Sequence, residues 1–473
     1  MSYVFQINTM TNQYKLPVIF SFFFSLFLFS CKKDIKEEIA ATTAPTPPPT
    51  PTPVGNTAQV NDVAFQKTQD YYLWNNQLPA TLNTSSFVDP IGVMTAIRQY
   101  SIEPGYTTPV DKWSFAMKKT EWDQYSGGMS SLATTAAEGD FGVTVFFRAE
   151  GDLRVRLVEP NSPSGIAGIK RGWRITKING NTNIATSNSQ FIIDNIYKAT
   201  SVSLTFTKPD GASVDVTLNA AHYTDKPVYL DTVYNTAAGN VGYLVYNSFL
   251  GNIGQTTANF SRVFDKFSAA GINNLIVDLR YNGGGYVNLQ EKLANYLVPG
   301  SAQGSVMMRQ IYNSNHSNEN STALYNKTGG LQLSKIYFIV SRSTASASEL
   351  LINNLKPYMD VRLIGNSNTH GKPVGYFPIE NGEWYVFPVS FKTLNKNGDG
   401  NYYGGFAPNA LVADGLDKDW GDISESSLAS ALRNINGGNY KATTESVYIE
   451  PLNVASGNNA LEKTMLKVTI GQK

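Results

Sequence analysis

Residues 336–352 read IYFIVSRSTASASELLI, and the rest of the chain is organised around this stretch. Five consecutive β-prone residues precede small residues and then an apolar run, which predicts a strand, a tight turn and a helix. The turn places Ser346 at the start of the helix, where unpaired N–H groups and the helix dipole favour developing negative charge. Ser346 is therefore a candidate nucleophile.

Ordinary helix capping explains the same pattern. Ser and Thr are common before an apolar run, and Glu349, three residues after Ser346, completes a capping-box sequence. On its own this stretch favours capping, so the catalytic interpretation depends on two further segments.

The first of these segments follows a short predicted strand at residues 361–365. Lys372 lies after this strand, in a loop flanked by glycines. A deprotonated lysine can act as the general base for a serine. Because the ordinary lysine pKa is near 10.4, such a base needs burial that lowers its pKa by about three, at a cost of about 4 kcal/mol. Only a folded cleft supplies that environment.

The second segment begins with the predicted strand LIVDLR at residues 275–280, which runs into YNGGG at residues 281–285. Three glycines between a strand and a helix leave backbone N–H groups able to approach an oxyanion closely.

These three motifs resemble those of the C-terminal processing peptidases, also called tail-specific or tricorn-core proteases, which are Ser-Lys enzymes. The shared pattern covers D-L-R-x-N-x-G-G at 278–285, the small-residue run at 344–349 and Gly-Lys at 371–372. The resemblance implies an α/β peptidase core of the crotonase-like ββα type. It also implies a role for each matching residue: Ser346 as nucleophile, Lys372 as base, Glu349 as a supporting polar group, and the N–H groups of Ala347 and Gly284, or less favourably Gly285, as the oxyanion hole.

The chain departs from the family in three places. Thr344 stands where the pattern has serine, and the interval from Ser346 to Lys372 is slightly longer than expected. Tyr376 stands where some relatives carry glutamine. His370 also leaves a Ser-His-Asp arrangement open, although the sequence marks no partner acid.

The composition bears on the number of domains and on which ligands the protein binds. The 473 residues and 42% hydrophobic content predict two or three domains with well-formed cores. Lys and Arg number 38 against 37 Asp and Glu, which disfavours nucleic-acid binding. One cysteine and three scattered histidines argue against an intramolecular disulfide, a metal site or any cofactor.

The first 58 residues predict export and anchoring. Residues 16–29 are apolar but shorter than the roughly 20 residues that span a bilayer, so residues 1–30 are predicted to be a signal peptide. The sequence LFSC at 28–31 resembles a bacterial lipobox, which implies lipid on Cys31; a plain signal peptide is the alternative. Residues 31–58 form a Pro/Thr-rich linker. We therefore expect a lipid-anchored protein of the bacterial cell envelope, facing the periplasm or the surface.

Two smaller domains are predicted before the core. Residues 59–130 should form an N-terminal helical domain, and its phrases YYLW and DKWSF resemble lipoprotein-type members of the same family. Residues 138–222 predict short strands with one helix, and their run 162–180 resembles the middle of a PDZ domain. PDZ domains bind a chain's C-terminus as an added strand. The resemblance makes Phe141-Gly142-Val143 the carboxylate loop; a degenerate PDZ fold kept for packing or gating is the alternative.

Residues 227–437 alternate between strand and helix, as in an α/β peptidase core. Within them, residues 301–332 are rich in Asn and Ser and predict a long surface loop. Residues 395–406 superficially resemble a calcium loop, but the twelfth position is Phe406, so we expect a turn. The extension at 438–473 carries no recognisable chemistry.

The sequence thus predicts a multidomain α+β protein that acts as an envelope-anchored serine endopeptidase on polypeptide substrates. Its PDZ-like domain would recognise a substrate's C-terminus or gate the site. The alternative is a non-catalytic PDZ-bearing lipoprotein that binds peptides or scaffolds envelope proteins.

Overall fold

The computed structural model describes residues 57–126 and 139–440. The predicted signal peptide, the lipidation site Cys31, most of the linker and nearly all of the C-terminal extension therefore lie outside the described residues. Within the described part of the chain, every helix is too short or too polar to cross a membrane.

A six-stranded sheet forms the largest core, with strand order β18-β13-β12-β9-β8-β7. All neighbouring pairs are parallel except β7 with β8. The carboxyl ends of parallel strands meet at one edge, so the segments after β9, β12 and β13 gather there. The strands are β7 (Val228–Thr236), β8 (Gly239–Tyr246), β9 (Asn274–Asp278), β12 (Lys335–Val340), β13 (Asp360–Gly365) and β18 (Ala410–Leu411).

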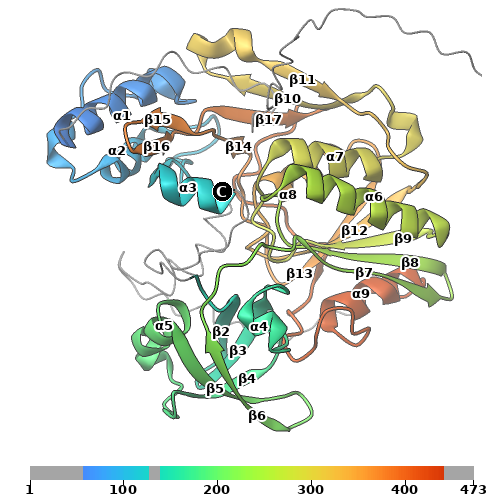
Figure 1. Ribbon diagram of the computed structural model, residues 1–473. Coiled ribbons are helices and arrows are strands. Elements are labelled where there is room, and N and C mark those ends of the chain that lie inside the picture. The colour runs from blue at the N-terminus through green and yellow to red at the C-terminus, as the bar shows by residue number, and fades with distance from the viewer. Residues whose placement is uncertain (1–56, 127–138, 441–473) are drawn as a thin grey trace, which may run out of the picture. The chain divides into compact units, whose positions relative to one another are not determined.

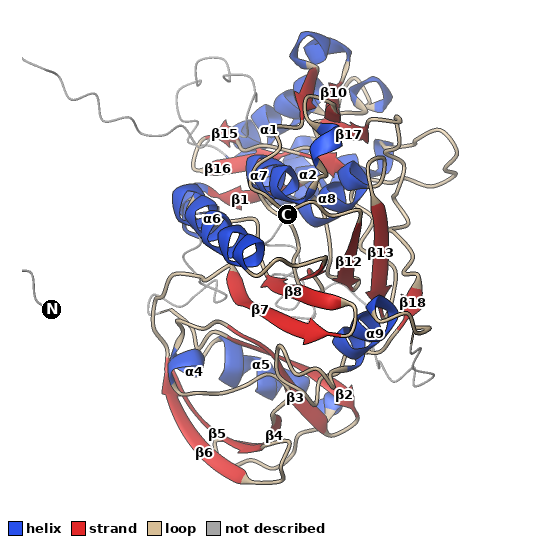
Figure 2. Cartoon of the chain, turned by 90° about the vertical axis from the view of Figure 1, so that its right-hand side faces the viewer, coloured by secondary structure: helices blue, strands red, loops and turns tan. Residues whose placement is uncertain are grey.

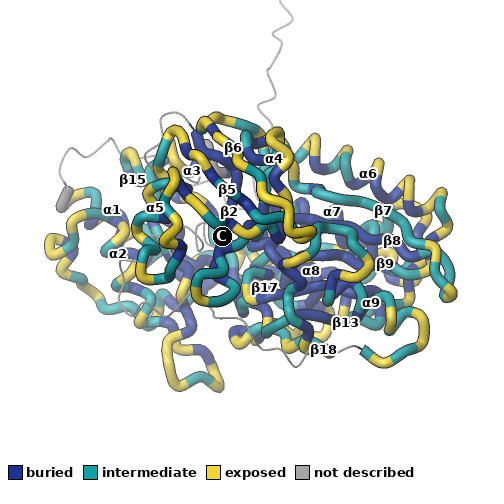
Figure 3. Tube along the Cα trace, turned by 90° about the horizontal axis from the view of Figure 1, so that it is seen from below, coloured by how far each residue is buried: buried dark blue, intermediate teal, exposed yellow. Residues whose placement is uncertain are grey.

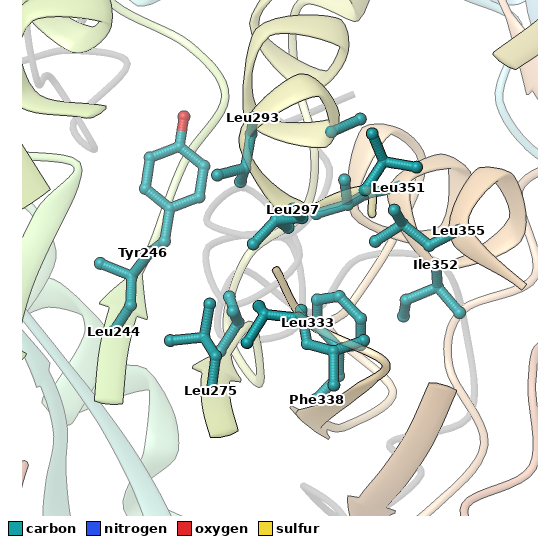
Figure 4. Close-up of a cluster of buried hydrophobic side chains, with 14 of the residues drawn as sticks. Leu244, Tyr246, Leu275, Leu293, Leu297, Leu333, Phe338, Leu351, Ile352 and Leu355 are labelled. Atoms are coloured by element: carbon teal, nitrogen blue, oxygen red, sulfur yellow. The ribbon is translucent and has the colours of Figure 1, made fainter. Parts of the chain in front are cut away.

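Helices cover both faces of this sheet (Figure 1). On one face pack α6 (Ile253–Ala269), α7 (Val287–Leu297) and α8 (Ala347–Leu355), and on the other packs α9 (Ser426–Ile435). Figure 4 shows how leucines of α7 and α8 meet side chains from β8, β9 and β12. α6, α7 and α8 lie in the crossovers that parallel pairing requires, whereas α9 follows the last strand, β18.

The amphipathic pattern of α6 shows why these elements form. Asn252 caps the helix by accepting from the Gln255 N–H at 2.9 Å. Its buried residues recur at helical spacing, while the intervening ones are exposed or half-buried (Figure 3). The sequence prediction for this helical face is confirmed by its buried members, which include Phe260, Val263, Phe264 and Phe267.

A separate five-stranded antiparallel sheet runs in the order β2-β3-β4-β5-β6 (Figure 2). We call residues 139–221 the five-stranded module. α4 and α5 belong to it, and its buried side chains form a separate cluster that also includes Leu416. The elements are β2 (Val143–Ala149), β3 (Asp152–Val158), α4 (Pro163–Ile166), β4 (Arg174–Ile178), α5 (Ser189–Tyr197), β5 (Ser201–Thr207) and β6 (Ser213–Asn219).

The N-terminal segment contributes more than helices. β1 (Phe115–Lys118) pairs with β16 (Trp384–Phe387), which also pairs with β15 (Ile379–Asn381). Aromatic residues near the start of the chain therefore share a buried cluster with residues 374–391. The helices of this segment are α1 (Thr57–Tyr71), α2 (Pro90–Ile97) and α3 (Lys119–Ser126).

The prediction that residues 301–332 form a long loop is wrong. β10 (Val306–Tyr312) and β11 (Ser321–Leu324) belong to a sheet of order β11-β10-β17-β14, with β14 (Val374–Gly375) and β17 (Phe391–Asn395). The Asn- and Ser-rich composition comes from the connection between β10 and β11, and it obscured the alternating buried residues of β10.

A buried ionic network holds the end of β9. Arg280, 2% exposed, donates to Asp278 at 2.7 Å, to Asp414 at 2.6 Å and to Glu425 at 2.9 Å. Burial alone would raise the pKa of Asp414, but Arg171 and Arg280 hold it well below its ordinary value. A lowered folded-state pKa means that this carboxylate stabilises the fold at neutral pH and loses that contribution as the pH falls.

Replacing Arg280 by alanine should lower the free energy of unfolding by about 3–5 kcal/mol, because three buried carboxylates lose their shared cation. The control is Arg262→Ala, whose partner Asp231 lies at 2.7 Å but whose own side chain is 53% exposed. That variant should lose less than about 1 kcal/mol. Urea unfolding followed by fluorescence measures both, and equal losses would contradict the assignment of the network as a stabilising core element.

Candidate active site

One buried carboxylate brings the predicted site residues together. Glu349 is 0% exposed, and its Oε2 accepts the backbone N–H of Ser346 at 3.0 Å and that of Lys372 at 2.8 Å. Because both N–H groups donate to the same oxygen, the two backbone nitrogens lie no further apart than the sum of those distances. The structure thus joins the start of α8 to the loop after β13.

The other oxygen of Glu349 binds that loop again. Oε1 accepts the Thr369 hydroxyl and the Gly371 N–H, both at 2.6 Å. Burial raises the pKa of Glu349 to about 7, although the four donors favour its charged form. Sequence reasoning assigned Glu349 a supporting role but missed Thr369, which no motif marked.

Ser346 has an unusual backbone. Its φ of 54° and ψ of −117° lie in a region that L-residues rarely adopt, and among the described residues only Asn179 shares a positive φ without being glycine. Such a conformation costs on the order of 1–3 kcal/mol and persists only where surrounding contacts impose it. The turn leaves Ser346 partly exposed between the buried residues Ala345 and Ala347.

The glycine-rich loop after β9 packs directly against this turn. A Cβ on Gly284 would lie 2.7 Å from the Cβ of Ser346 and 2.8 Å from the nitrogen of Ala347, so only glycine permits this approach. The Gly284 N–H donates to Asn282 Oδ1 at 2.9 Å. The structure therefore brings both predicted oxyanion residues to the turn, while engaging the N–H of Gly284 within its own loop.

Lys372 is buried, with 3% exposure, and points at an aromatic ring. Its Nζ lies 3.8 Å from the ring centroid of Tyr376, the residue that departs from the family pattern. Tyr376 packs edge-on against Phe115 of β1 and Phe387 of β16 at 5.2 and 5.7 Å. The N-terminal segment thus helps to build the wall behind Lys372.

His370 already has a hydrogen-bond partner on its ring. Its Nε2 accepts the indole N–H of Trp113 at 3.0 Å, and its backbone N–H donates to the Thr344 carbonyl at 2.9 Å. An accepting Nε2 places the ring proton on Nδ1. The geometry therefore gives the Ser-His-Asp alternative no support, since this nitrogen is directed to Trp113.

The five-stranded module contacts the rest of the described structure through two arginines, one at the loop before Ser346 and one in the ionic network. Arg156 of β3 donates to the Ser343 hydroxyl at 2.7 Å and lies 4.3 Å from the ring of Tyr281. Arg171 pairs with Asp414 and donates to the Lys418 carbonyl at 2.7 Å. Sequence reasoning missed both arginines, because nothing local marks a contact so distant along the chain.

The predicted carboxylate loop lies at the start of β2, in the five-stranded module. Phe141 and Val143 are buried, and the Gly142 N–H donates to Asp140 Oδ1 at 2.7 Å. Across residues 57–126 and 139–440, no cluster of three or more His, Cys, Asp or Glu side chains is arranged to hold a metal ion.

Curated proteins similar to this chain include two, from different staphylococcal species, that are named as probable CtpA-like serine proteases. The one from Staphylococcus saprophyticus is 26% identical over 261 residues, covering 53% of this chain and 50% of the relative. The one from Staphylococcus epidermidis is 25% identical over 268 residues, covering 56% and 50%. The chain spans about half the length of the curated relatives it matches.

A solved structure assigned to the S41 proteases, from Bacteroides fragilis, superposes with a TM-score of 0.64 at 21% identity. It covers 83% of this chain and 99% of that one, which shows a shared mixed helix-and-sheet fold. Residues 240–409 match the model of peptidase family S41, and this range contains the glycine-rich loop, the Ser346 turn and Lys372. This segment of the chain is therefore similar to peptidase family S41, and the relatives that it matches are named as serine proteases.

Proposed function

We propose that this chain is a serine endopeptidase of the C-terminal processing type, with Ser346 as nucleophile and Lys372 as general base. The observation that carries the proposal is the Glu349 carboxylate, which binds the backbone of both residues through one oxygen. A partly exposed serine in a strained turn beside a buried lysine has the parts that acyl transfer requires.

The proposed reaction uses only side chains and backbone of this chain. The neutral amine of Lys372 takes the hydroxyl proton of Ser346 as Oγ attacks a peptide carbonyl carbon. The protonated amine then gives its proton to the leaving nitrogen as the peptide C–N bond breaks. Water hydrolyses the resulting ester and regenerates the hydroxyl of Ser346. No cofactor is needed for these steps.

Stabilisation of the oxyanion is proposed to come first from the Ala347 N–H, at the N-terminus of α8. Gly284 is the second proposed donor. Its N–H donates to Asn282 in this structure, so it would have to share that hydrogen or turn toward the substrate. The contribution of Gly284 is therefore proposed to be smaller than that of Ala347.

We extend the proposal to the rest of the chain. The five-stranded module is proposed to be PDZ-like and the six-stranded sheet to be a crotonase-like core, since strand order and helix placement fit both. The signal peptide, lipidation of Cys31 and a place in the bacterial cell envelope stay proposals that rest on the first 58 residues alone.

Replacing Ser346 or Lys372 by alanine should reduce kcat/KM for a fluorogenic peptide by about 10³-fold or more, with the fold retained. A fluorophosphonate probe should label Ser346 in the wild type. His370→Ala should keep labelling and most turnover, because the proposed base is the lysine. Failure of the probe to label folded wild-type protein would favour the non-catalytic lipoprotein, and retained turnover in Lys372→Ala would contradict the dyad.

The raised pKa of Glu349 predicts a pH-dependent stability. Its folded-state value of about 7 lies above the ordinary 4.5, so its contribution is fully present below pH 4.5 and is lost as the pH rises through 7. Between these limits the loss should be on the order of 3 kcal/mol. The measurement is urea unfolding at several pH values in an inactive Ser346→Ala background. Adding Glu349→Gln should remove the fall in the free energy of unfolding between pH 4.5 and pH 7.

The control for that experiment is Glu383→Gln, because Glu383 is 74% exposed and pairs with Lys118 at the surface. Its stability difference from the same background should not vary with pH. If the free energy of unfolding falls with pH as steeply after Glu349→Gln as before, another group titrates in this range and the assignment to Glu349 is contradicted.

A further inference from the structure

The outer edge of β2 is the place where the five-stranded module would add a peptide strand. β2 is the edge strand of its sheet, and strand addition binds a peptide through the N–H and C=O groups of such an edge. A chain's terminal carboxylate would be held by N–H groups where the strand begins. The question is whether those N–H groups can receive a ligand.

The first N–H group is occupied by a carboxylate of the same chain. Asp140 Oδ1 accepts the Gly142 N–H at 2.7 Å and the Tyr223 hydroxyl at 2.6 Å. The backbone of Asp140 is fixed as well, by a two-way antiparallel bridge to Ala221. A ligand carboxylate at this point would replace a side chain that is 4% exposed and would meet its negative charge.

A second N–H group on the same strand is occupied by a tyrosine. The hydroxyl of Tyr197, the last residue of α5, accepts the Val145 N–H at 3.0 Å. Tyr197 is 4% exposed, and burial raises its pKa to about 12, so the hydroxyl stays neutral. Val145 itself is 0% exposed, and its neighbours along β2 are almost as deeply buried.

Two arginines of the module, Arg156 and Arg171, bind other parts of the described structure. Arg156 binds the loop that leads to Ser346, and Arg171 binds Asp414 in the ionic network around Arg280. Both contacts are made by side chains of the module itself. The module therefore engages the loop before Ser346 and the ionic network through its own residues.

We infer that the edge of β2 is closed by Asp140 and Tyr197, so that this peptidase accepts substrates without reading a C-terminal carboxylate. The inference rests on the proposed function and narrows its substrates to polypeptides that are cleaved whether or not their C-terminus is a free carboxylate. It also assigns the module a role in positioning the loop before Ser346 and no role in recognising a substrate's C-terminus.

The test compares two fluorogenic peptides of identical sequence, one ending in a carboxylate and one in an amide. For the wild-type chain, kcat/KM should agree within about twofold. Tyr197→Phe and Asp140→Ala each release one N–H group, so each should lower KM for the acid peptide by several-fold relative to the amide. Two variants are used because Asp140→Ala also removes the bond to Tyr223.

Tyr234→Phe is the matched control, since it removes a tyrosine hydroxyl that donates to the Gly421 carbonyl at 2.7 Å, away from β2. The ratio of kcat/KM for the acid peptide to kcat/KM for the amide peptide should be the same in Tyr234→Phe as in the wild type. A wild-type preference for the acid of about tenfold or more would overturn the inference. Ratios that stay at one in both Tyr197→Phe and Asp140→Ala would overturn the assignment of these side chains as the closure.

A binding measurement separates this inference from the proposed chemistry. Fluorescence anisotropy of a labelled peptide with a free C-terminus is followed on the full chain carrying Ser346→Ala. The free-acid peptide should bind no more tightly than the same peptide ending in an amide, and adding Tyr197→Phe should create a preference for the acid. Tighter binding of the acid than of the amide without Tyr197→Phe would overturn the closed edge. Absence of turnover and probe labelling in the wild type would instead count against the peptidase, leaving this binding test valid.

Discussion

The carboxylate of Glu349 is the interaction on which the proposed site depends. It is completely buried, and four donors from the α8 turn and the loop after β13 surround it. Moving either segment would leave a buried acceptor with fewer partners, which is costly in a low-dielectric interior. The same contacts offset the strained backbone of Ser346, because the N–H of that residue is one of the four donors.

The parallel sheet explains why segments so far apart in sequence reach this carboxylate. β9, β12 and β13 are adjacent and parallel, so the chain leaves all three at one edge. Two residues just beyond β9 make different contacts: Arg280 belongs to the ionic network, and Gly284 packs against the Ser346 turn. The module reaches both regions through Arg171 and Arg156. The ionic network and the proposed active site thus lie next to each other, just beyond the end of β9.

Much of the core was predictable because its signals are local. The strand, turn and helix around Ser346 follow from an apolar run, small residues and a second apolar run, and β12 and α8 confirm this prediction. The helical face of α6 was equally clear. β10 and β11 were missed because an Asn-rich connection dominated the local composition.

The missed contacts are long-range. Trp113 reaches His370 across 257 residues, and Arg156 reaches Ser343 across 187. No periodicity or motif encodes such pairings, because they arise only when separate sheets pack. β1 was missed for the same reason, since its partner β16 lies much later in the chain. The motifs of the candidate site could therefore be found in the sequence, whereas the residues that hold those motifs in place could not.

The central claim is that this carboxylate brings a serine hydroxyl and a lysine amine to one carbonyl. A crystal structure of the full chain after reaction with a peptidyl phosphonate tests it most directly. The account predicts a covalent bond from phosphorus to Ser346 Oγ, a phosphonyl oxygen on the Ala347 N–H and Lys372 Nζ within hydrogen-bond distance of Oγ. Modification of another residue, or an Nζ far from Oγ, would contradict it.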